Sequence, residues 1–158
     1  MLKTIYIKTP LGTLEIMGDA DGVQKAIFAD GTTLLSQHIP EELEDCVAQF
    51  QEYFEKKRTT FDLKLNPNGT SFQQKVWEDL LKVPFGKTES YLTMSRRFGD
   101  EKAIRAIASA NGKNPIAIII PCHRIIGSDG SLTGYAGGLW RKKWLLEFEQ
   151  NIEQTSLF

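Results

Sequence analysis

Three consecutive polar side chains, Cys122, His123 and Arg124, form the part of the sequence best suited to chemistry. They follow an apolar, mostly β-branched run at residues 116–120, which predicts a buried strand. Pro121 lacks the N–H that a sheet requires, so it marks the end of that strand. Polar groups at a buried position cost free energy unless they are paired. Cys122 is therefore the first candidate for a nucleophile, set against the more ordinary role of a buried cysteine as a small hydrophobic residue.

A cysteine attacks as the thiolate, so Cys122 needs a base or a lowered pKa. His123 is the obvious helper, but adjacent residues of an extended chain point to opposite faces, so their contact requires a backbone turn or a bridging water. A histidine that acts as a base also needs a partner that orients its ring. Glu147 and Glu149 in the last predicted helix are both suitable, and helical periodicity does not choose between them. Asn114 is a further polar group that could orient the local backbone.

The first part of the chain is expected to combine a strand meander with one helix. Alternation of polar and apolar residues predicts three strands, at residues 4–9, 13–17 and 23–28. An apolar stripe predicts a helix at residues 40–57, and residues 61–65 alternate like one more strand. The loop residues Asn66-Pro67-Asn68-Gly69 follow. We place a domain boundary there, between a first domain at residues 1–68 and a second at residues 69–153.

The second domain is expected to be built around helices. One helix begins at Thr70 or Ser71, and a final helix with an apolar stripe is predicted at about residues 139–150. Between them, short helices at residues 90–98 and 101–110 are joined by a turn that contains a glycine, which is a helix-turn-helix pattern. Basic side chains around this pair would suit contacts with phosphates, although a helix pair without a ligand has the same spacing.

Composition excludes several classes of protein. The 158 residues carry a net charge of −1, which argues against a strongly basic nucleic-acid binder but not against a local basic face. The two cysteines and two histidines stand at none of the short spacings of zinc sites, and we expect no metal and no cofactor. No segment approaches the length needed to span a membrane and no secretory signal is visible, so we expect a cytoplasmic protein with free thiols.

Several motifs together resemble the O6-alkylguanine-DNA alkyltransferase family. The run Pro121-Cys122-His123-Arg124-Ile125 is highly specific to that family, and Asn114-Pro115, Gly134-Tyr135 and Trp144-Leu145-Leu146 agree in order and spacing. The resemblance implies an α+β fold, with a small N-terminal RNase-H-like α/β domain followed by a mainly helical DNA-binding domain with a helix-turn-helix. It also implies a monomer that flips a base out of double-stranded alkylated DNA. The alkyl group of O6-alkylguanine, or of O4-alkylthymine, would then pass irreversibly to Cys122, once per molecule.

The resemblance further implies a role for individual residues. His123 would be the base, acting through a water, and Glu149 would orient it. Asn114 would support the geometry of the site, and Tyr91 would donate its hydroxyl proton to the departing base. Arg105 would enter the duplex from the minor groove and fill the gap left by the flipped base. The other expected DNA contacts are Arg96, Lys102, Ser109 and Lys113, and the expected substrate pocket is lined by Tyr135, Ala136 and Gly137.

The last five residues, 154–158, form a separate tail in this prediction. Gln154, Leu157 and Phe158 resemble the short peptide by which bacterial replication and repair proteins dock on the DNA sliding clamp. Thr155 departs from the leucine commonly found second in that peptide. The ordinary alternative is a frayed terminus, or one that packs on its own domain.

Two other classes of function fit parts of the pattern. A non-catalytic DNA-binding or regulatory module would use the helix-turn-helix alone and would keep its function after Cys122→Ala. A cysteine hydrolase would use the Cys–His–Glu arrangement and would turn over many molecules of an ester or amide, because water clears its acyl intermediate. Alkyl transfer differs from the non-catalytic module because it requires Cys122. It differs from the hydrolase because the thioether that it forms is stable.

Overall fold

The computed structural model describes residues 1–31 and 34–156, with side chains as far as Asn151, and the chain divides into two compact units. The first unit consists of Met1–Asn68 and a returning segment, Pro115–Ile119. The second unit consists of Gly69–Asn114 and the chain from Ile120 onward. The predicted first domain, residues 1–68, did not include the returning segment.

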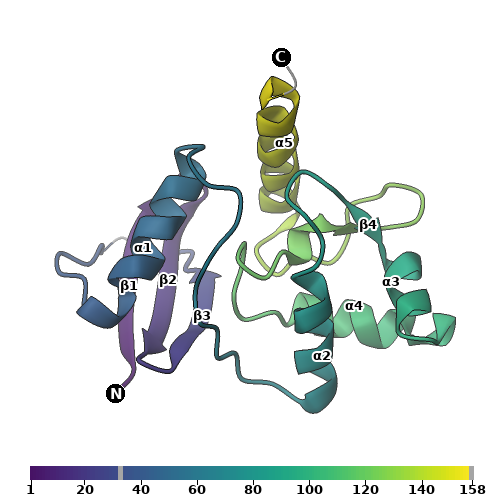
Figure 1. Cartoon of the computed structure of the whole chain (residues 1–158), viewed down its shortest axis with the longest axis horizontal. Helices are drawn as coiled ribbons and strands as arrows, with labels where there is room; N and C mark the ends of the chain where they lie inside the picture. The colour runs from purple at the N-terminus through teal and green to yellow at the C-terminus, as the bar shows by residue number, and fades with distance from the viewer. Residues whose placement is uncertain (32–33, 157–158) are drawn as a thin grey trace. The chain divides into compact units, whose positions relative to one another are not determined.

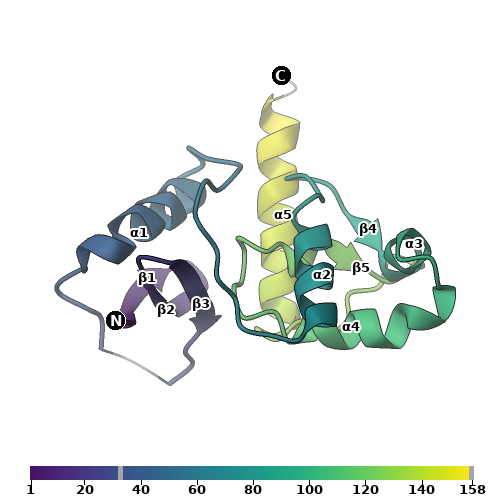
Figure 2. The ribbon, with the colours of Figure 1, turned by 60° about the horizontal axis from the view of Figure 1, so that its bottom comes forward.

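The first unit is a meander of three antiparallel strands with one helix across it (Figures 1 and 2). The strands β1 (Lys3–Thr9), β2 (Gly12–Asp19) and β3 (Gly22–Phe28) lie in that order in the sheet. Helix α1 (Glu41–Phe54) buries one apolar stripe and packs against β1 and β2. These elements confirm the strand and helix predictions for this part of the chain.

The predicted strand at residues 61–65 is wrong, because only Leu65 pairs with a strand, as an isolated bridge to Val23. The backbone of Asp62 is satisfied by a side chain instead of a neighbouring strand. Its N–H donates to Gln49 Oε1 at 2.8 Å, and its carbonyl accepts from Gln49 Nε2 at 3.0 Å. Local alternation does not reveal such a bond between distant residues, and the alternating pattern here reflects only that every second side chain is half-buried.

The returning segment lies against β3. Ala26 donates its N–H to the carbonyl of Pro115 at 2.8 Å, and the N–H of Ala117 donates to the carbonyl of Ala26 at 2.8 Å. These two bonds form an isolated parallel bridge between Ala26 and Ile116. A single bridge fixes the segment on the sheet without making it a strand.

The predicted strand at residues 116–120 is therefore also wrong. Two tight turns follow the bridge: Ile119 N–H donates to the Ala117 carbonyl, and Cys122 N–H donates to the Ile120 carbonyl, both at 2.8 Å. Each is a three-residue turn, and the first is centred on Ile118 with a φ of 72°, a rare and strained value for a β-branched residue. All five residues at 116–120 are buried, so the apolar run reports burial and not extended backbone.

The second unit contains the remaining helices and a short parallel pair of strands. Helix α2 (Ser71–Leu80) begins at a capping box in which Thr70 and Gln73 satisfy each other's backbone. Strand β4 (Glu89–Ser90) pairs with β5 (Ile125–Ile126), and α5 (Leu139–Ser156) ends the described chain. The helix runs farther than the predicted residues 139–150, so the backbone of Gln154 is helical. The expected docking residues Leu157 and Phe158 lie outside the described residues.

The predicted helix-turn-helix is confirmed. Helix α3 (Tyr91–Arg97) is followed by a 3-10 turn, η1 (Glu101–Ala103), and by α4 (Ile104–Gly112). Gly99 has a φ of 84° and ends α3 with the bonds Gly99 N–H to Arg96 and Asp100 N–H to Ser95. Asp100 then caps the next turn by accepting from the Lys102 N–H at 2.8 Å. The turn is therefore built from a glycine and an aspartate, as the sequence pattern required.

Candidate active site

Cys122 lies at the start of a short 3-10 turn, η2 (Cys122–Arg124), inside the second unit. The turn follows Pro121, whose φ of −82° and ψ of 61° bend the chain away from the extended form. Its three side chains are all buried, with exposed fractions of 4% for Cys122, 0% for His123 and 7% for Arg124. The turn removes the alternation that would send adjacent side chains to opposite faces of a strand.

His123 and Arg124 converge on one carboxylate, Glu149 of α5. His123 Nε2 lies 2.8 Å from Glu149 Oε2. Arg124 donates to the same carboxylate twice, from Nε to Oε1 at 2.8 Å and from Nη2 to Oε2 at 3.0 Å, and it donates from Nη1 to the Val83 carbonyl at 2.8 Å. Glu147, the other glutamate that periodicity left open, is exposed.

The charges of this cluster fix the protonation of His123. Burial alone would raise the pKa of the Glu149 carboxyl, but the bonds and charges of His123 and Arg124 bring it well below its usual range. Burial lowers the pKa of His123 despite the opposing effect of Glu149. A neutral ring beside an ionised carboxylate donates from Nε2, so Nδ1 carries the lone pair. Nδ1 is buried and has no hydrogen-bond partner among the described residues, which leaves it available as a base.

The thiol itself is held in its protonated form. Burial raises the pKa of Cys122, and this effect outweighs a hydrogen bond from Asn114 and the charge of Lys142, which both act to lower it. Asn114 also donates from Nδ2 to the Ile120 carbonyl at 2.8 Å, which fixes the backbone just before Pro121. A protonated, buried thiol requires a base for attack, and the free Nδ1 of His123 is of the right chemical kind.

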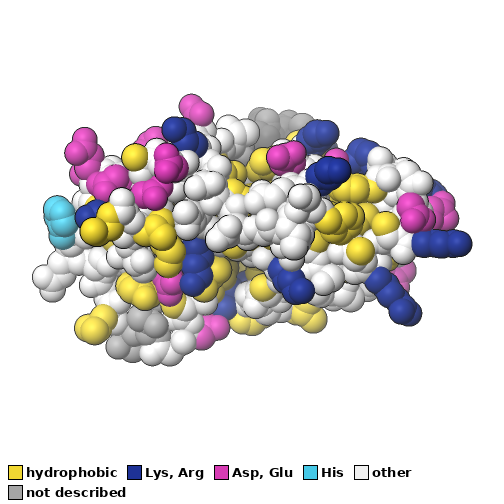
Figure 3. All heavy atoms as spheres, turned by 90° about the horizontal axis from the view of Figure 1, so that it is seen from below, with side chains coloured by type: hydrophobic (Ala, Val, Ile, Leu, Met, Phe, Trp, Pro, Cys, Tyr) yellow, Lys and Arg dark blue, Asp and Glu magenta, His cyan; other side chains and the backbone are white. Residues whose placement is uncertain are grey.

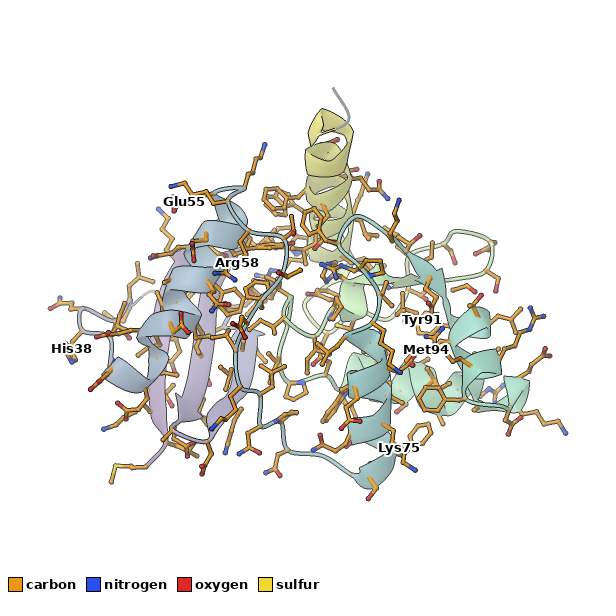
Figure 4. The ribbon with its side chains drawn as sticks, in the orientation of Figure 1. His38, Glu55, Arg58, Lys75, Tyr91 and Met94 are labelled. Carbon is orange, nitrogen blue, oxygen red and sulfur yellow. The ribbon has the colours of Figure 1, made fainter. Side chains whose placement is uncertain are left out.

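Tyr91, from the start of α3, supplies a phenol to the same region. Figure 4 labels it with Met94, and both are on the buried side of that helix. Its hydroxyl accepts a hydrogen bond from Asn111 Nδ2 at 3.1 Å, and the same nitrogen lies 3.4 Å from the Cys122 carbonyl. Burial raises the pKa of Tyr91, so the phenol keeps its proton at neutral pH. Tyr91 is therefore a neutral O–H donor, and the side chain of Asn111 links it to the backbone of Cys122.

The residues expected to line the substrate pocket lie in a glycine-rich loop, residues 134–138. Tyr135 is buried, and its hydroxyl has no hydrogen-bond partner among the described residues. Ala136 is exposed, and the Gly137 carbonyl accepts from Arg141 Nη1 at 2.9 Å. Gly134 has a φ of 65°, and a Cβ built there would lie 3.4 Å from the Tyr91 hydroxyl. Glycine at this position therefore places no side chain against the Tyr91 hydroxyl.

Sequence reasoning missed three residues that the structure brings to this region. Arg124 was visible in the Cys-His-Arg run but received no role. Lys142 is fully buried on α5, donates from Nζ to the Thr133 carbonyl at 2.7 Å and lies 5.8 Å from the centre of the Tyr91 ring. Asn111 is 1% exposed at the end of α4. A lysine in a helix usually reads as a solvated side chain, so no sequence signal separated Lys142 from its neighbours.

The five side chains predicted to contact DNA are all exposed on the helix-turn-helix and the residue that follows it; they are Arg96, Lys102, Arg105, Ser109 and Lys113. Figure 3 shows lysine and arginine side chains projecting from the surface, interspersed with acidic ones. Arg96 forms an exposed ion pair with Glu101, Nε to Oε1 at 2.8 Å. Arg97 is bound by Asp79 and Glu89. Arg105 makes no ion pair with the described residues and is free to reach a ligand.

The described residues offer neither a metal-binding cluster nor a membrane-spanning helix. Among residues 1–31 and 34–156, no three histidine, cysteine or acidic side chains group as a metal site would require. No helix in the same part of the chain is long and apolar enough to cross a membrane.

Comparison with known proteins assigns both units. The family description "6-O-methylguanine DNA methyltransferase, ribonuclease-like domain" matches residues 1–67, and its DNA binding domain matches residues 71–151. A methylated-DNA–protein-cysteine methyltransferase of Methanosarcina barkeri is 42% identical over 152 residues, 92% of this chain and 95% of that protein.

Solved structures agree with these matches. The crystal structure of the Mycobacterium tuberculosis O6-methylguanine methyltransferase superposes with a TM-score of 0.85 at 40% identity, covering 96% of this chain and 94% of that one. The M. tuberculosis protein in complex with DNA gives a TM-score of 0.84 at 41% identity, over 93% and 92% of the two chains. The expected α+β fold, with a ribonuclease-like domain and a helical DNA-binding domain, is confirmed. The chain belongs to the 6-O-methylguanine DNA methyltransferase family.

Proposed function

We propose that Cys122 is the cysteine to which this protein transfers an alkyl group from O6 of guanine in DNA. The observation that carries the proposal is the buried His123–Glu149 pair at 2.8 Å, which leaves the second ring nitrogen of His123 without a hydrogen-bond partner among the described residues and available as a base for the thiol of Cys122, the preceding residue. The family's activity, direct repair of alkylated DNA by transfer to a protein cysteine, requires such a thiol. O4-alkylthymine offers the same alkyl–oxygen bond and is a second substrate in this proposal.

The reaction is a single displacement. The Cys122 thiol gives its proton, through a bridging water, to Nδ1 of His123, and Glu149 stabilises the resulting imidazolium. The sulfur attacks the alkyl carbon, so that an S–C bond forms while the C–O6 bond breaks and its electron pair stays on the base. Tyr91 gives its hydroxyl proton to the departing base, and the proton held by His123 later restores the phenol through solvent. The product thioether is stable, so each molecule acts once.

The helix-turn-helix is the proposed DNA-binding surface. A base within a duplex is out of reach of a buried thiol, so the nucleotide must be flipped out at a cost of a few kcal/mol. We assign Arg105 to the gap that the flipped base leaves, with α4 in the minor groove. Arg96, Lys102, Ser109 and Lys113 would contact the backbone, and Arg96 would exchange Glu101 for a phosphate.

The chain end carries a second, independent proposal. Gln154, Leu157 and Phe158 would dock on a DNA sliding clamp, which would bring the repair protein to newly replicated DNA. The sequence resemblance supports this docking. We also propose that the protein acts as a monomer, without a metal or cofactor, in the cytoplasm where its DNA substrate is held.

Stoichiometry tests the main proposal. The protein is incubated with an excess of duplex that contains one O6-methylguanine, and the repaired duplex is counted over time. We expect repair to stop when one duplex has been repaired per protein molecule. Continued turnover would contradict a thioether product, and the absence of repair by a folded preparation would contradict the proposal altogether.

A further inference from the structure

The buried amide of Asn111 lies close to two polar partners in the second unit. Asn111 is 1% exposed, and its Nδ2 lies 3.1 Å from the Tyr91 hydroxyl and 3.4 Å from the Cys122 carbonyl. The end of α4 that carries it is fixed by its neighbour, since Trp77 Nε1 donates to the Ala110 carbonyl at 2.9 Å. Asn111, at the end of a helix, therefore connects the Tyr91 phenol to the backbone of Cys122.

The two partners determine which atom of the amide faces them. A carbonyl oxygen only accepts hydrogen bonds, so the amide atom beside the Cys122 carbonyl must be the NH2 group. The same NH2 group then gives its second hydrogen to the Tyr91 oxygen. Asn111 Oδ1 is buried and has no hydrogen-bond partner among the described residues, so this amide acts through its donor side.

A phenol oxygen that accepts from Asn111 keeps its own hydrogen for another partner. The side chain of Thr133 is its other hydrogen-bonding neighbour in the structure, and Gly134 places no Cβ in contact with the hydroxyl. The Asn111 bond also stabilises the phenolate that remains after the proton leaves. We propose that Asn111 is a positioning residue that holds Tyr91 as the proton donor to the departing base. The inference rests on the proposed function and adds a residue to it.

A double-mutant cycle tests this role through the saturating rate of methyl transfer from an O6-methylguanine duplex, measured in single turnover. We expect Tyr91→Phe to slow transfer on the order of 100-fold, as loss of a general acid does. Asn111→Ala should slow it about tenfold, as loss of one hydrogen bond does. In the Tyr91→Phe background the second substitution should have no further effect, because Asn111 acts through the phenol. Exposed Asn68 provides the matched control, Asn68→Ala, in which the rate is unchanged.

A second readout separates positioning from general damage to the site. Iodoacetamide alkylates a thiol and releases iodide, which needs no proton, so Asn111→Ala should react at Cys122 at the wild-type rate. Asn111→Asp keeps the shape of the side chain but presents only acceptors, so it should slow methyl transfer at least as much as alanine does. This variant replaces Asn111→Ala if the alanine protein does not fold.

Three outcomes would overturn the inference. Equal slowing by Asn111→Ala with and without the Tyr91 hydroxyl would show that the residue acts independently of Tyr91. A matching loss of iodoacetamide reactivity would show that the thiol, and not the proton donor, depends on Asn111. Failure of the wild-type protein to accept the methyl group would remove the proposed function together with this role. This failure is distinguishable from the other two, because it appears in the wild-type protein and they appear only in the variants.

Discussion

His123 and Glu149 are 26 residues apart in the sequence, yet Nε2 of one lies 2.8 Å from Oε2 of the other. Both side chains are buried, at 0% and 1% exposure, so water does not weaken the bond. The carboxylate is also bound twice by Arg124. The pair thus fixes which nitrogen of the histidine donates and which is free.

Glu149→Gln should slow methyl transfer on the order of 100-fold, because the neutral amide no longer stabilises the imidazolium of His123. It should also lower the free energy of unfolding by about 3 kcal/mol, since the buried guanidinium of Arg124 loses its counter-charge. Single-turnover transfer and urea unfolding measure the two effects. Exposed Glu147→Gln is the matched control and should leave both unchanged.

Stability should fall on acidification in two stages. The pKa of His123 is lowered by folding, so the unfolded chain binds its proton first, and the free energy of unfolding falls as the pH drops below the ordinary value of 6.5. The pKa of Glu149 is also lowered, so a further loss begins below 4.5. Chemical unfolding between pH 8 and pH 4 records the curve, with His123→Asn as the comparison. An unchanged free energy of unfolding between pH 7 and pH 5 would contradict the protonation assigned to His123.

Lys142→Met should slow transfer, because the buried ammonium lowers the pKa of the Cys122 thiol and its loss leaves a smaller fraction of thiolate. Burial lowers the pKa of Lys142 to about 8, so its charge is lost on the alkaline side of neutrality. The wild-type saturating rate should therefore lose the lysine's contribution as the pH rises through this value, and Lys142→Met should lack that step. Lys142→Arg, which keeps the charge, should retain most of the rate at neutral pH. Identical pH profiles for wild type and Lys142→Met would exclude the electrostatic role.

Arg105→Ala should slow repair of duplex DNA and leave the reaction with free O6-methylguanine base unchanged. The free base needs no flipping, so the cost of a few kcal/mol that an inserted side chain offsets is absent. The ratio of the two rates in wild type and variant is the measurement. Equal slowing with both substrates would place Arg105 in the chemistry of the site and not in the duplex.

Deletion of residues 154–158 should abolish binding to a sliding clamp and leave methyl transfer at the wild-type rate. Titration of a labelled clamp with the two proteins measures the first effect. Substitution of both Leu157 and Phe158 by alanine in the full chain provides the matched control for chain length. It should also abolish clamp binding, because the proposal assigns docking to these side chains. Equal affinity with and without the tail would end the clamp proposal.

The sequence predicted well what local patterns encode. The strand meander, the first helix, the helix start at Thr70 or Ser71 and the glycine-aspartate turn of the helix-turn-helix each depend on neighbouring residues. Each is present, and the structure selects Thr70 as the cap. The run at 116–120 misled because its residues are buried on every side, and periodicity cannot distinguish such burial from a strand. The turns around Ile118 and Pro121 depend on hydrogen bonds that no pattern announces.

The residues around the thiol were only partly predictable. Helical periodicity named Glu147 and Glu149 together, and only the packing of α5 separates the buried one from the exposed one. The place of Asn111 and Lys142 at the site is known only from the folded structure. In the sequence, each is a polar residue in or next to a predicted helix and resembles a surface residue. Their burial beside Tyr91 is a tertiary fact.

The central claim is that Cys122 takes the alkyl group, and the mass of a labelled methyl group tests it most directly. The protein is incubated with duplex DNA that carries O6-(trideuteromethyl)guanine, digested and examined by peptide mass spectrometry. We predict one deuterated methyl group per chain, located on Cys122 and absent from Cys122→Ser, while buried Cys46, whose pKa burial raises to about 12, stays unmodified. A deuterated methyl group on any other residue, or none on a folded wild-type protein, would contradict the account.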